Sequence, residues 1–308
     1  MKILVTGAAG FVGRNLIPVL ENYGHEIIGT DITEEKPLAF EHLNAVYEVC
    51  DIVNRKKIAR LLNQVDLVIH LAGEASLNVD NSLYKRNNIF AGSLLIEEII
   101  KANVTRLVFL SSIKVENASS NYAISKKIIE NKIINSSPNN FSYTILRCAA
   151  IYGRDMKSNI IDWLIKAKNN VLLRIPESKS TLSLIGIDDL CKIISKCIEN
   201  EAVYNKTYHV SDGVSYSINQ LEVAARKLSV AKESKGFKAS IGTYPRWMLY
   251  LGAKFGDIVN AFGIKFPFNS SAYNIFFKNI ARFDPAIFDD LDYQPTQNFI
   301  AEIPAILK

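Results

Sequence analysis

The sequence predicts a doubly wound α/β fold, in which helices cover both faces of a parallel β-sheet. Short apolar runs alternate with segments of helical periodicity over the first 150 residues. Runs such as Leu67–Leu71 are almost continuously apolar, as expected for strands that are buried on both faces. A glycine-rich turn joins the first run to the first helical segment. In this fold class, ligands bind at the carboxyl ends of the strands.

The elements of the first region follow from these patterns in chain order. The expected strands are Lys2–Val5, Glu26–Gly29, Val46–Cys50, Leu67–Leu71, Leu107–Leu110 and Tyr143–Leu146. The expected helices are Gly13–Asn22, Lys56–Asn63, Leu83–Lys101 and Tyr122–Ile134. We therefore assign residues 1–153 to a dinucleotide-binding domain of the Rossmann type.

The pattern loosens after Gly153, which indicates a smaller C-terminal α/β domain. The expected elements there are helices Asn159–Lys168, Asp188–Glu199 and Ile218–Leu228, strands Val171–Ile175 and Thr207–Val210, and a loop Pro176–Thr181. Ser217 is the expected N-cap of the helix that follows it. We assign residues 154–308 mainly to a substrate-binding domain, with 187–213 returning to the first domain.

Composition and charge exclude several classes of protein. The chain has 308 residues, of which 48% are hydrophobic and 22% charged, so it is neither disordered nor a disulfide scaffold. Its net charge of 36 − 31 = +5 is spread along the chain, which argues against a nucleic-acid partner. No stretch is apolar enough to span a membrane, and the four histidines lie on separate segments without metal-ligand spacing.

Cysteine spacing and the first residues indicate the compartment. The four cysteines, Cys50, Cys148, Cys191 and Cys197, show no CxxC spacing. The first ten residues, MKILVTGAAG, lead directly into a strand and a turn and do not resemble a signal peptide. We therefore expect a reduced protein of the cytoplasm.

The segment Tyr244–Phe268 is rich in aromatic residues. Its apolar residues at 247, 248, 251, 255, 258, 259 and 262 have helical spacing. A lid, a dimer face or a membrane-surface helix would show this pattern, and so would core packing of a small second domain. We favour core packing.

The turn after the first strand has the spacing of a phosphate-binding loop. Gly7, Gly10 and Gly13 lie in the run TGAAGFVG between a strand and a helix. Gly7 permits a sharp turn, Gly10 allows the backbone to approach a pyrophosphate, and Gly13 permits close packing of helix and sheet. The N-terminus of the helix offers N–H groups and a partial positive charge to phosphates.

Asp31 at the end of the second strand indicates which dinucleotide is bound. It lies 18 positions after Gly13, where a carboxylate can accept hydrogen bonds from both hydroxyls of the adenosine ribose. The same carboxylate would repel a 2′-phosphate, and the nearest cationic residue in the sequence is Lys36. The sequence therefore favours NAD over NADP.

A candidate catalytic set follows the strand Leu107–Leu110. Ser111 and Ser112 directly follow that strand. Tyr122 and Lys126 lie four residues apart, on one face of a helix. A phenol has a pKa near 10 and is a poor base at neutral pH. We expect the Lys126 ammonium, with a nicotinamide cation, to lower the pKa of Tyr122.

These motifs resemble the extended short-chain dehydrogenase/reductase family, in order along nearly the whole chain. The family's patterns match TGAAGFVG, Cys50-Asp51-Ile52, His70-Leu71-Ala72-Gly73, Asn88-Ile89, Ser112, the YxxxK of Tyr122 and Lys126, LRCAAIYG from Leu146, Ile187-Asp188-Asp189-Leu190 and FDPAIFDDLDYQP from Phe283. The segment Ser-Ser-Ile-Lys-Val is similar to nucleotide-sugar 4-epimerases and 4-ketosugar reductases of polysaccharide pathways.

The resemblance implies an NAD-dependent epimerase or dehydratase of a nucleotide sugar, of the UDP-glucose 4-epimerase type. Ser112, Tyr122 and Lys126 would be catalytic, with Tyr122 as acid and base. The cofactor contacts implied are Gly7, Gly10, Phe11, Val12, Gly13, Asp31, Ile32, Asp51, Ile52, Leu71, Ala72, Gly73, Asn88, Ser111, Tyr122, Lys126 and Cys148. Pairing of helices 83–101 and 122–134 with a second copy would give a homodimer.

Three positions depart from the family pattern on the substrate side. The interval between Ser112 and Tyr122 is short, Ala150 replaces a common Asn, and Leu182 replaces an Arg that clamps the diphosphate. Lys179, Arg246 or Arg282 are candidate replacements. The alternatives are a net reductase of a 4-ketosugar or other carbonyl, including a hydroxysteroid-type dehydrogenase, and a non-catalytic dinucleotide sensor.

Overall fold

The structure is a computed structural model that describes residues 1–34, 36–75, 79–117, 120–138, 140–156, 159–169, 176, 180–228, 245–262, 264, 266, 268–277, 281–282 and 284–307. The expected strand Val171–Ile175, most of the loop that follows it, and Lys179 lie outside these residues. The chain forms two compact units. The first contains 1–149, 187–210 and 284–295, and the second contains 150–186, 211–283 and 296–308. Residues 284–295 thus belong with the first unit, although the sequence assigned them to the second.

The first unit is built on a seven-stranded sheet in which every neighbouring pair is parallel. In sheet order its strands are β3 (Val46–Val49), β2 (Glu26–Asp31), β1 (Lys2–Thr6), β4 (Leu67–His70), β5 (Arg106–Ser112), β6 (Ser142–Cys148) and β9 (Lys206–Val210). The order reverses between β1 and β4, where ligands bind in doubly wound folds. The expected fold class is confirmed.

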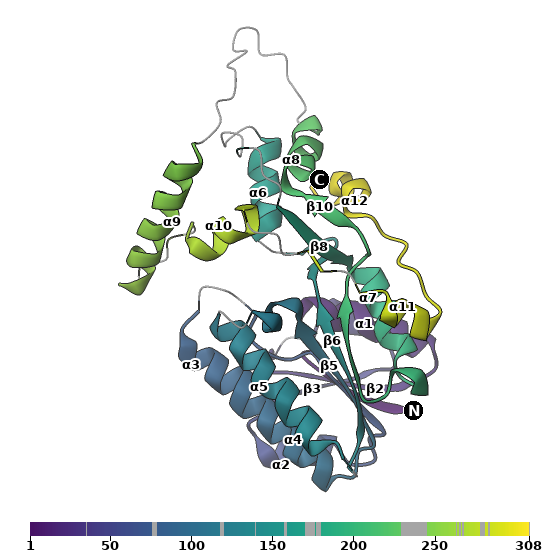
Figure 1. The fold of residues 1–308 in the computed structure, drawn as a ribbon. Coiled ribbons are helices and arrows are strands. Elements are labelled where there is room, and N and C mark those ends of the chain that lie inside the picture. The colour runs from purple at the N-terminus through teal and green to yellow at the C-terminus, as the bar shows by residue number, and fades with distance from the viewer. Residues whose placement is uncertain are drawn as a thin grey trace. The chain divides into compact units, whose positions relative to one another are not determined.

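Helices cover both faces of this sheet. Helices α2 (Arg55–Leu61), α4 (Ala91–Lys101) and α5 (Asn121–Ser136) lie on one face, and α1 (Phe11–Asn22) and α7 (Ile187–Lys196) pack together on the other (Figure 1). The remaining helices of this unit are η1 (Leu38–Phe40), α3 (Asn81–Leu83), η2 (Tyr84–Phe90), η3 (Ile113–Glu116), η4 (Glu201–Val203) and α11 (Ala286–Leu291). A buried cluster that includes Leu95, Phe109 and Ile129 fills the space between the sheet and α4 and α5.

One expected helix differs from the prediction. The segment Leu83–Lys101 was expected to be a continuous α-helix, but Tyr84–Phe90 forms a π-helix before α4 begins. The wider turns hold the buried Asn88, whose side chain bonds to residues outside the helix. Such π-helical turns are frequent at functional sites.

The second unit contains a three-stranded sheet that the sequence did not predict. Its order is β10 (Ser215–Ser217), β8 (Thr181–Gly186) and β7 (Ala150–Tyr152), with β10 antiparallel and β7 parallel to β8. Its helices are α6 (Asn159–Lys168), α8 (Ile218–Lys227), α9 (Arg246–Ala261), α10 (Ser270–Phe277) and α12 (Phe299–Ile306). Its core includes Trp163, Tyr216 and Phe299. Ser217 and Gln220 form a capping box at α8, which confirms the expected N-cap.

The preferred interpretation of the aromatic segment is wrong. Helix α9 forms as its spacing predicted, but its large apolar side chains are exposed. Trp247, Leu251, Phe255 and Ile258 each expose more than half of their accessible surface, with values of 66%, 56%, 58% and 57%. Only the side of α9 that carries Ala253 is buried among the described residues.

Candidate active site

The glycine turn between β1 and α1 is closed tightly against the end of β4. Gly7 has a φ of +74°, and a Cβ there would lie 2.7 Å from the backbone nitrogen of Ala72. A Cβ on Gly13 would lie 2.3 Å from the carbonyl oxygen of Gly7. Both positions therefore require glycine. Gly10 precedes the first residue of α1, Phe11, and supplies no side-chain cap. The turn thus presents bare backbone at a helix N-terminus, which fits a dinucleotide pyrophosphate.

Asp31 ends β2 next to this turn. Its Oδ2 accepts a hydrogen bond from Ala9 N at 3.1 Å, and its Oδ1 accepts one from Ile32 N at 2.7 Å. These bonds hold the carboxylate beside the glycine turn, where the ribose of a bound dinucleotide is expected. Val12, by contrast, is buried against the fold, and Ile32 is exposed.

The end of β4 is held by buried polar contacts. His70 Nδ1 and Thr6 Oγ1 are 2.8 Å apart, which links β4 to β1. Burial, with a smaller effect from the charge of Lys126, lowers the pKa of His70 to about 3, so this imidazole is neutral. Leu71 and Ala72 continue from His70 into the segment against which Gly7 packs.

Asn88 fixes the loop that follows Gly73. Its Oδ1 accepts a hydrogen bond from Glu74 N at 2.6 Å, and its Nδ2 donates to Ser125 Oγ at 2.9 Å. A Cβ on Gly73 would lie 2.9 Å from Asn88 Oδ1. Asn88 therefore ties the loop to α5.

Asp51 and Ile52 occupy different environments. Ile52 is buried in the core of the first unit, whereas the Asp51 carboxylate is partly exposed and forms an ion pair with Arg86 at 2.5 Å. Arg86 belongs to the π-helix, and no sequence pattern predicts its pairing with Asp51. The ion pair connects the loop after β3 to η2.

The predicted catalytic residues are brought together at the carboxyl end of β5. Ser112 is the last residue of β5, and Tyr122 lies in the first turn of α5, which Ser120 caps by accepting from Ala123 N at 3.2 Å. The Ser112 side chain lies beside the Tyr122 phenol and acts to lower its pKa. Lys114 was not singled out by the sequence, and its amino group lies 5.8 Å from the centre of the Tyr122 ring.

The expected lowering of the Tyr122 pKa is not seen. Burial raises the pKa of Tyr122 to about 12, and the hydrogen bond with Ser112 offsets only part of that effect. Lys126 Nζ donates instead to the carbonyl oxygen of Leu110 at 2.9 Å, and it lies 4.8 Å from the centre of the Phe109 ring. Burial lowers the pKa of Lys126 to about 8, so the amino group stays largely protonated at neutral pH.

The buried carboxylate of Glu130 binds two residues next to this site. Glu130 is fully buried; it accepts hydrogen bonds from Arg147 Nη2 at 2.7 Å, Arg147 Nε at 3.0 Å and Ser111 Oγ at 2.6 Å. Burial alone would raise the pKa of Glu130, but the bonds from Arg147 and Ser111 outweigh it and lower the pKa. Ser111, expected to contact the cofactor, donates its hydroxyl to Glu130, and Cys148 is a buried free thiol.

The spacing of residues along α5 is a sequence signal that could have identified Glu130. Tyr122, Lys126 and Glu130 are spaced by four, so they share one face of α5. The face that carries the candidate acid–base pair therefore also carries the carboxylate that holds Arg147 and Ser111.

The apolar surroundings of Leu182 explain why this position does not hold a cationic residue. Leu182 is buried in the core of the second unit, where it pairs with Tyr216 on β10. Arg282 runs beside the same strand, because its backbone N–H donates to Ser183 Oγ at 2.9 Å. The guanidinium of Arg246 lies 5.0 Å from the centre of the Phe277 ring. Arg282 is therefore the described candidate cation adjacent to the departure at Leu182.

Metal and membrane-spanning elements are absent from the described residues. These residues contain no group of three or more His, Cys, Asp or Glu side chains that could hold a metal ion. Among the helices that they form, none combines the length and hydrophobicity needed to cross a membrane.

The fold and the site define a dinucleotide-binding α/β protein with a Ser-Tyr-Lys set at the end of its fifth strand. The chain belongs to the family described as the NAD dependent epimerase/dehydratase family, whose profile matches residues 3–211. It is an NAD-dependent enzyme of the epimerase/oxidoreductase type, as the sequence predicted.

Named relatives agree with this assignment, and a solved structure agrees with the fold. The chain is 25% identical to a UDP-glucose 4-epimerase of Vibrio cholerae over 84% of each chain. It is 26% identical to a GDP-6-deoxy-D-talose 4-dehydrogenase of Aggregatibacter actinomycetemcomitans over 72% of this chain and 78% of the other. A UDP-glucose 4-epimerase of Thermotoga maritima, solved with UDP-glucose, matches with a TM-score of 0.75 and 19% identity over 100% of this chain and 97% of that chain.

Proposed function

We propose that this chain interconverts the C4 epimers of a nucleoside-diphosphate sugar. The observation that carries the proposal is that Ser112, at the carboxyl end of β5, lies beside Tyr122, which shares one face of α5 with the buried Lys126 amino group. The 25% sequence identity to a UDP-glucose 4-epimerase over most of both chains supports a nucleotide sugar as the class of substrate.

Each residue of the site has its own part in the proposed reaction. NAD, when bound by the glycine turn and Asp31, supplies the acceptor and donor of hydride. Tyr122 removes the proton of the sugar 4-hydroxyl as hydride leaves C4, and it returns that proton when hydride comes back to the opposite face of the 4-keto sugar. Ser112 donates a hydrogen bond to the same oxygen. The high pKa of Tyr122 makes its phenolate a strong base once formed, and the buried Lys126 ammonium lies on the same face of α5.

The second unit supplies the substrate cation in this proposal. A diphosphate needs a guanidinium or ammonium partner, and Leu182 offers none because it is buried among apolar residues. Arg282 takes this role because hydrogen bonds fix its backbone beside β8, next to Leu182. Its backbone oxygen accepts from Ser183 Oγ at 2.8 Å, and the neighbouring Ala281 N donates to Thr181 O at 3.1 Å.

A net oxidoreductase of the sugar 4-position is the second candidate function. It is favoured by the relative named as a GDP-6-deoxy-D-talose 4-dehydrogenase, whose identity to this chain is similar to that of the epimerase. The same Ser112, Tyr122 and Lys126 serve either reaction, because both pass through proton and hydride removal at one carbinol.

Assembly and location complete the proposal. Helix α5 exposes Ile124 (42%) and Ile128 (40%), and Phe90 before α4 exposes 59%. These side chains would be covered in a homodimer, which light scattering at micromolar concentration tests; a monomer contradicts it. All four cysteines are buried and unpaired, which agrees with a reducing compartment such as the cytoplasm.

The two functions are separated by product and cofactor balance. Purified chain is denatured and the small molecules released are identified by mass spectrometry; NAD and a nucleotide sugar are expected. The chain is then incubated with UDP-, GDP- and CDP-sugars, and the products are followed by NMR. Epimerisation without net change in NADH supports the first candidate, and stoichiometric NADH use supports the second. If no sugar nucleotide is converted and the cofactor is not reduced, both are wrong.

A further inference from the structure

Helix α9 carries large apolar side chains on the face that points away from its neighbour. One side of α9 packs on α10 and the residues before it, where a Cβ on Gly256 would lie 1.9 Å from Phe268 O. On the other side, at the residue spacing of an α-helix, the large apolar side chains lie within an arc of about 100° around the helix axis. This outer face of α9 consists of Trp247, Met248, Leu251, Phe255, Ile258 and Phe262, which expose between 40% and 80% of their surface.

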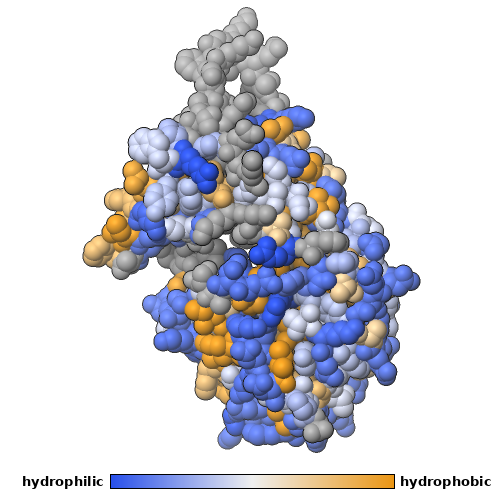
Figure 2. Space-filling view, viewed as in Figure 1, coloured by the Kyte–Doolittle hydropathy of each residue, from blue (hydrophilic) through white to orange (hydrophobic). Residues whose placement is uncertain are grey.

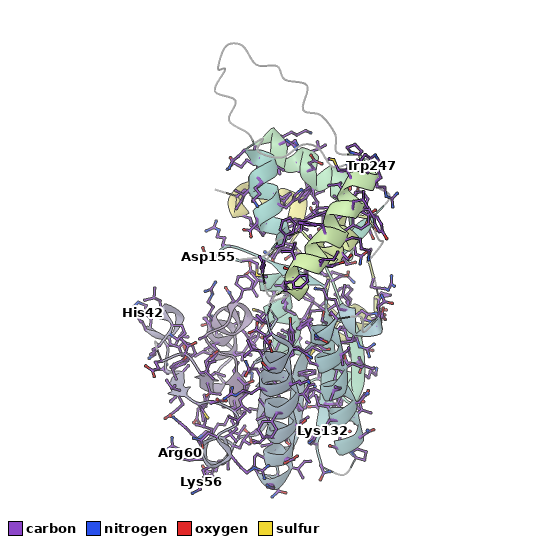
Figure 3. All side chains as sticks on the ribbon, turned by 90° about the vertical axis from the view of Figure 1, so that its left-hand side faces the viewer. His42, Lys56, Arg60, Lys132, Asp155 and Trp247 are labelled. Atoms are coloured by element: carbon purple, nitrogen blue, oxygen red, sulfur yellow. The ribbon has the colours of Figure 1, made fainter. Side chains whose placement is uncertain are left out.

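The outer face of α9 differs from an ordinary solvent-facing helix surface. On α7, the exposed positions are Asp188, Lys192 and Lys196, which are all charged. A soluble surface helix normally has such a polar outer side. Figure 2 shows apolar residues along α9, at the left of the view, and Figure 3 shows Trp247 at its N-terminal end. A contiguous apolar patch of this kind marks an interaction site.

Charge around the outer face of α9 favours an anionic partner. The helix carries two cations, Arg246 and Lys254, and one acid, Asp257. The Asp257 carboxylate is taken up by α10, because it accepts hydrogen bonds from Ser270 N at 3.0 Å and from Ser270 Oγ at 2.5 Å. The Lys254 ammonium lies 5.8 Å from the centre of the Tyr250 ring, at the edge of the apolar face. Lys254 is therefore the cation of α9 that lies beside the outer face, whereas the Arg246 guanidinium turns to α10, where it lies 5.0 Å from the centre of the Phe277 ring and donates to Tyr273 Oη at 3.4 Å.

The residue types on α9 favour a lipid surface as the partner. Trp and Tyr combine an apolar body with a polar tip and concentrate at the boundary between lipid and water. Trp247 and Tyr250 are the residues of these two types on α9, and both are exposed.

We propose that α9 binds the surface of an anionic phospholipid bilayer and lies parallel to it. The outer face of α9 enters the boundary between headgroups and acyl chains, at a depth of about 5–10 Å, while Lys254 contacts lipid phosphates. This makes the chain a peripheral membrane protein through its second unit. The proposal does not depend on the reaction, because the binding test needs no turnover.

Trp247 is a built-in probe for the test. The chain has two tryptophans, and the other, Trp163, is buried against Phe276. In a Trp163→Phe background, emission therefore comes from Trp247 alone. Vesicles of phosphatidylglycerol and phosphatidylcholine are added to the full chain, and vesicles of phosphatidylcholine alone are the comparison. A shift of emission to shorter wavelength and co-sedimentation with the anionic vesicles are expected. The unsubstituted chain is sedimented in parallel, in case Trp163→Phe unfolds.

Substitutions assign the binding to α9. Leu251→Glu or Phe255→Glu removes a buried apolar side chain from the bilayer, which weakens binding at least about tenfold. Lys254→Gln weakens binding to anionic vesicles about fivefold and leaves binding to neutral vesicles unchanged. Val223→Glu on α8, where Val223 is 53% exposed, is the matched control and binds as the parent does. Thermal unfolding verifies that each variant folds.

Three results would overturn the proposal. One is sedimentation of Leu251→Glu and Phe255→Glu to the same extent as the parent. A second is a Trp247 shift that follows protein concentration without vesicles, which identifies a second copy as the occupant. A third is a shift produced by NAD or a nucleotide sugar but not by vesicles, which identifies a lid.

Discussion

The two units of the chain differ in how their functional side chains are held. In the first unit, the candidate catalytic and cofactor residues are held by specific partners, such as the Leu110 carbonyl for Lys126, Glu130 for Ser111 and the Asn88 amide for the loop after Gly73. In the second unit, the expected cation position is occupied by a buried leucine, and the most prominent side chains lie on an exposed helix. The first unit holds its site in place before a ligand arrives, whereas the second presents surfaces that await one.

This contrast has a physical cause. A dinucleotide makes the same contacts in many proteins, so the elements that bind it are constrained by backbone geometry, as the Cβ clashes at Gly7 and Gly13 show. A variable substrate or surface is met by side chains on loops and peripheral helices, which tolerate change. The predictions below test whether the two units differ in this way, from the largest expected effect to the smallest.

Removal of the Tyr122 hydroxyl should have the largest effect. Tyr122→Phe loses the acid–base group, so kcat should fall by roughly 10²–10⁴-fold, while NAD binding and thermal stability stay close to the parent. Tyr84→Phe is the matched control, since its ring centre lies 6.3 Å from that of Tyr122, and it should change kcat less than about threefold. Steady-state kinetics measure both, and full activity of Tyr122→Phe would show that another group moves the proton.

Breaking the buried ion pair should destabilise the first unit. Glu130→Gln leaves the Arg147 guanidinium without its carboxylate, at a cost of about 3–5 kcal/mol in the free energy of unfolding. The control is Glu97→Gln, because Glu97 pairs with Arg55 and Lys132 at a surface where such pairs are worth about 0–1 kcal/mol. Figure 3 shows Lys132 on the outer side of α5. Urea unfolding measures both, and equal costs would contradict a supporting role for Glu130.

Acid should destabilise the fold through His70. Because the pKa of His70 is about 3 in the fold and about 6.5 in the unfolded chain, the unfolded chain binds an extra proton as pH falls below 6.5. This part of the stability is present above pH 6.5 and is lost towards pH 3, which amounts to about 2 kcal/mol between pH 7 and pH 5.

The measurement is urea unfolding at pH 7 and pH 5. His70→Gln has no such titration, so the pH dependence of its unfolding should be smaller than that of the parent by about this amount. An unchanged pH dependence in His70→Gln would mean that the imidazole has the same pKa in the fold as in the unfolded chain.

Arg282 should have the smallest effect, confined to substrate binding. Arg282→Ala should raise KM for the nucleotide sugar about tenfold with kcat within about twofold, since a diphosphate contact acts equally in ground and transition states. Arg246→Ala is the control and should leave KM unchanged. Reversal of these two results would place the diphosphate cation on α9 instead.

Much of the first unit could be predicted because its signals are local. The glycine turn, the apolar strands and the Tyr122–Lys126 spacing each depend on a few neighbouring residues. The π-helix at Tyr84–Phe90 could not be predicted in this way, because its wider turns hold an Asn88 whose partners, Glu74 and Ser125, are distant in sequence. Glu130 was within reach of the spacing argument.

The second unit was predicted less well for two reasons. Strands β7 and β10 have three residues each, which is too short for a periodic pattern, and β10 reads Ser-Tyr-Ser. In α9 the helical spacing was correct, but apolar residues lie on both of its sides. Periodicity shows that an apolar face exists and not what covers it, so burial was assigned to the wrong side.

The distribution of two rare residue types makes the units separately observable. All four cysteines, Cys50, Cys148, Cys191 and Cys197, lie in the first unit and are buried, whereas both tryptophans, Trp163 and Trp247, lie in the second. Thiol labelling during urea unfolding therefore times the opening of the first unit, while fluorescence times that of the second. A single unmodified sample can thus reveal whether the two units unfold as one cooperative block or in succession.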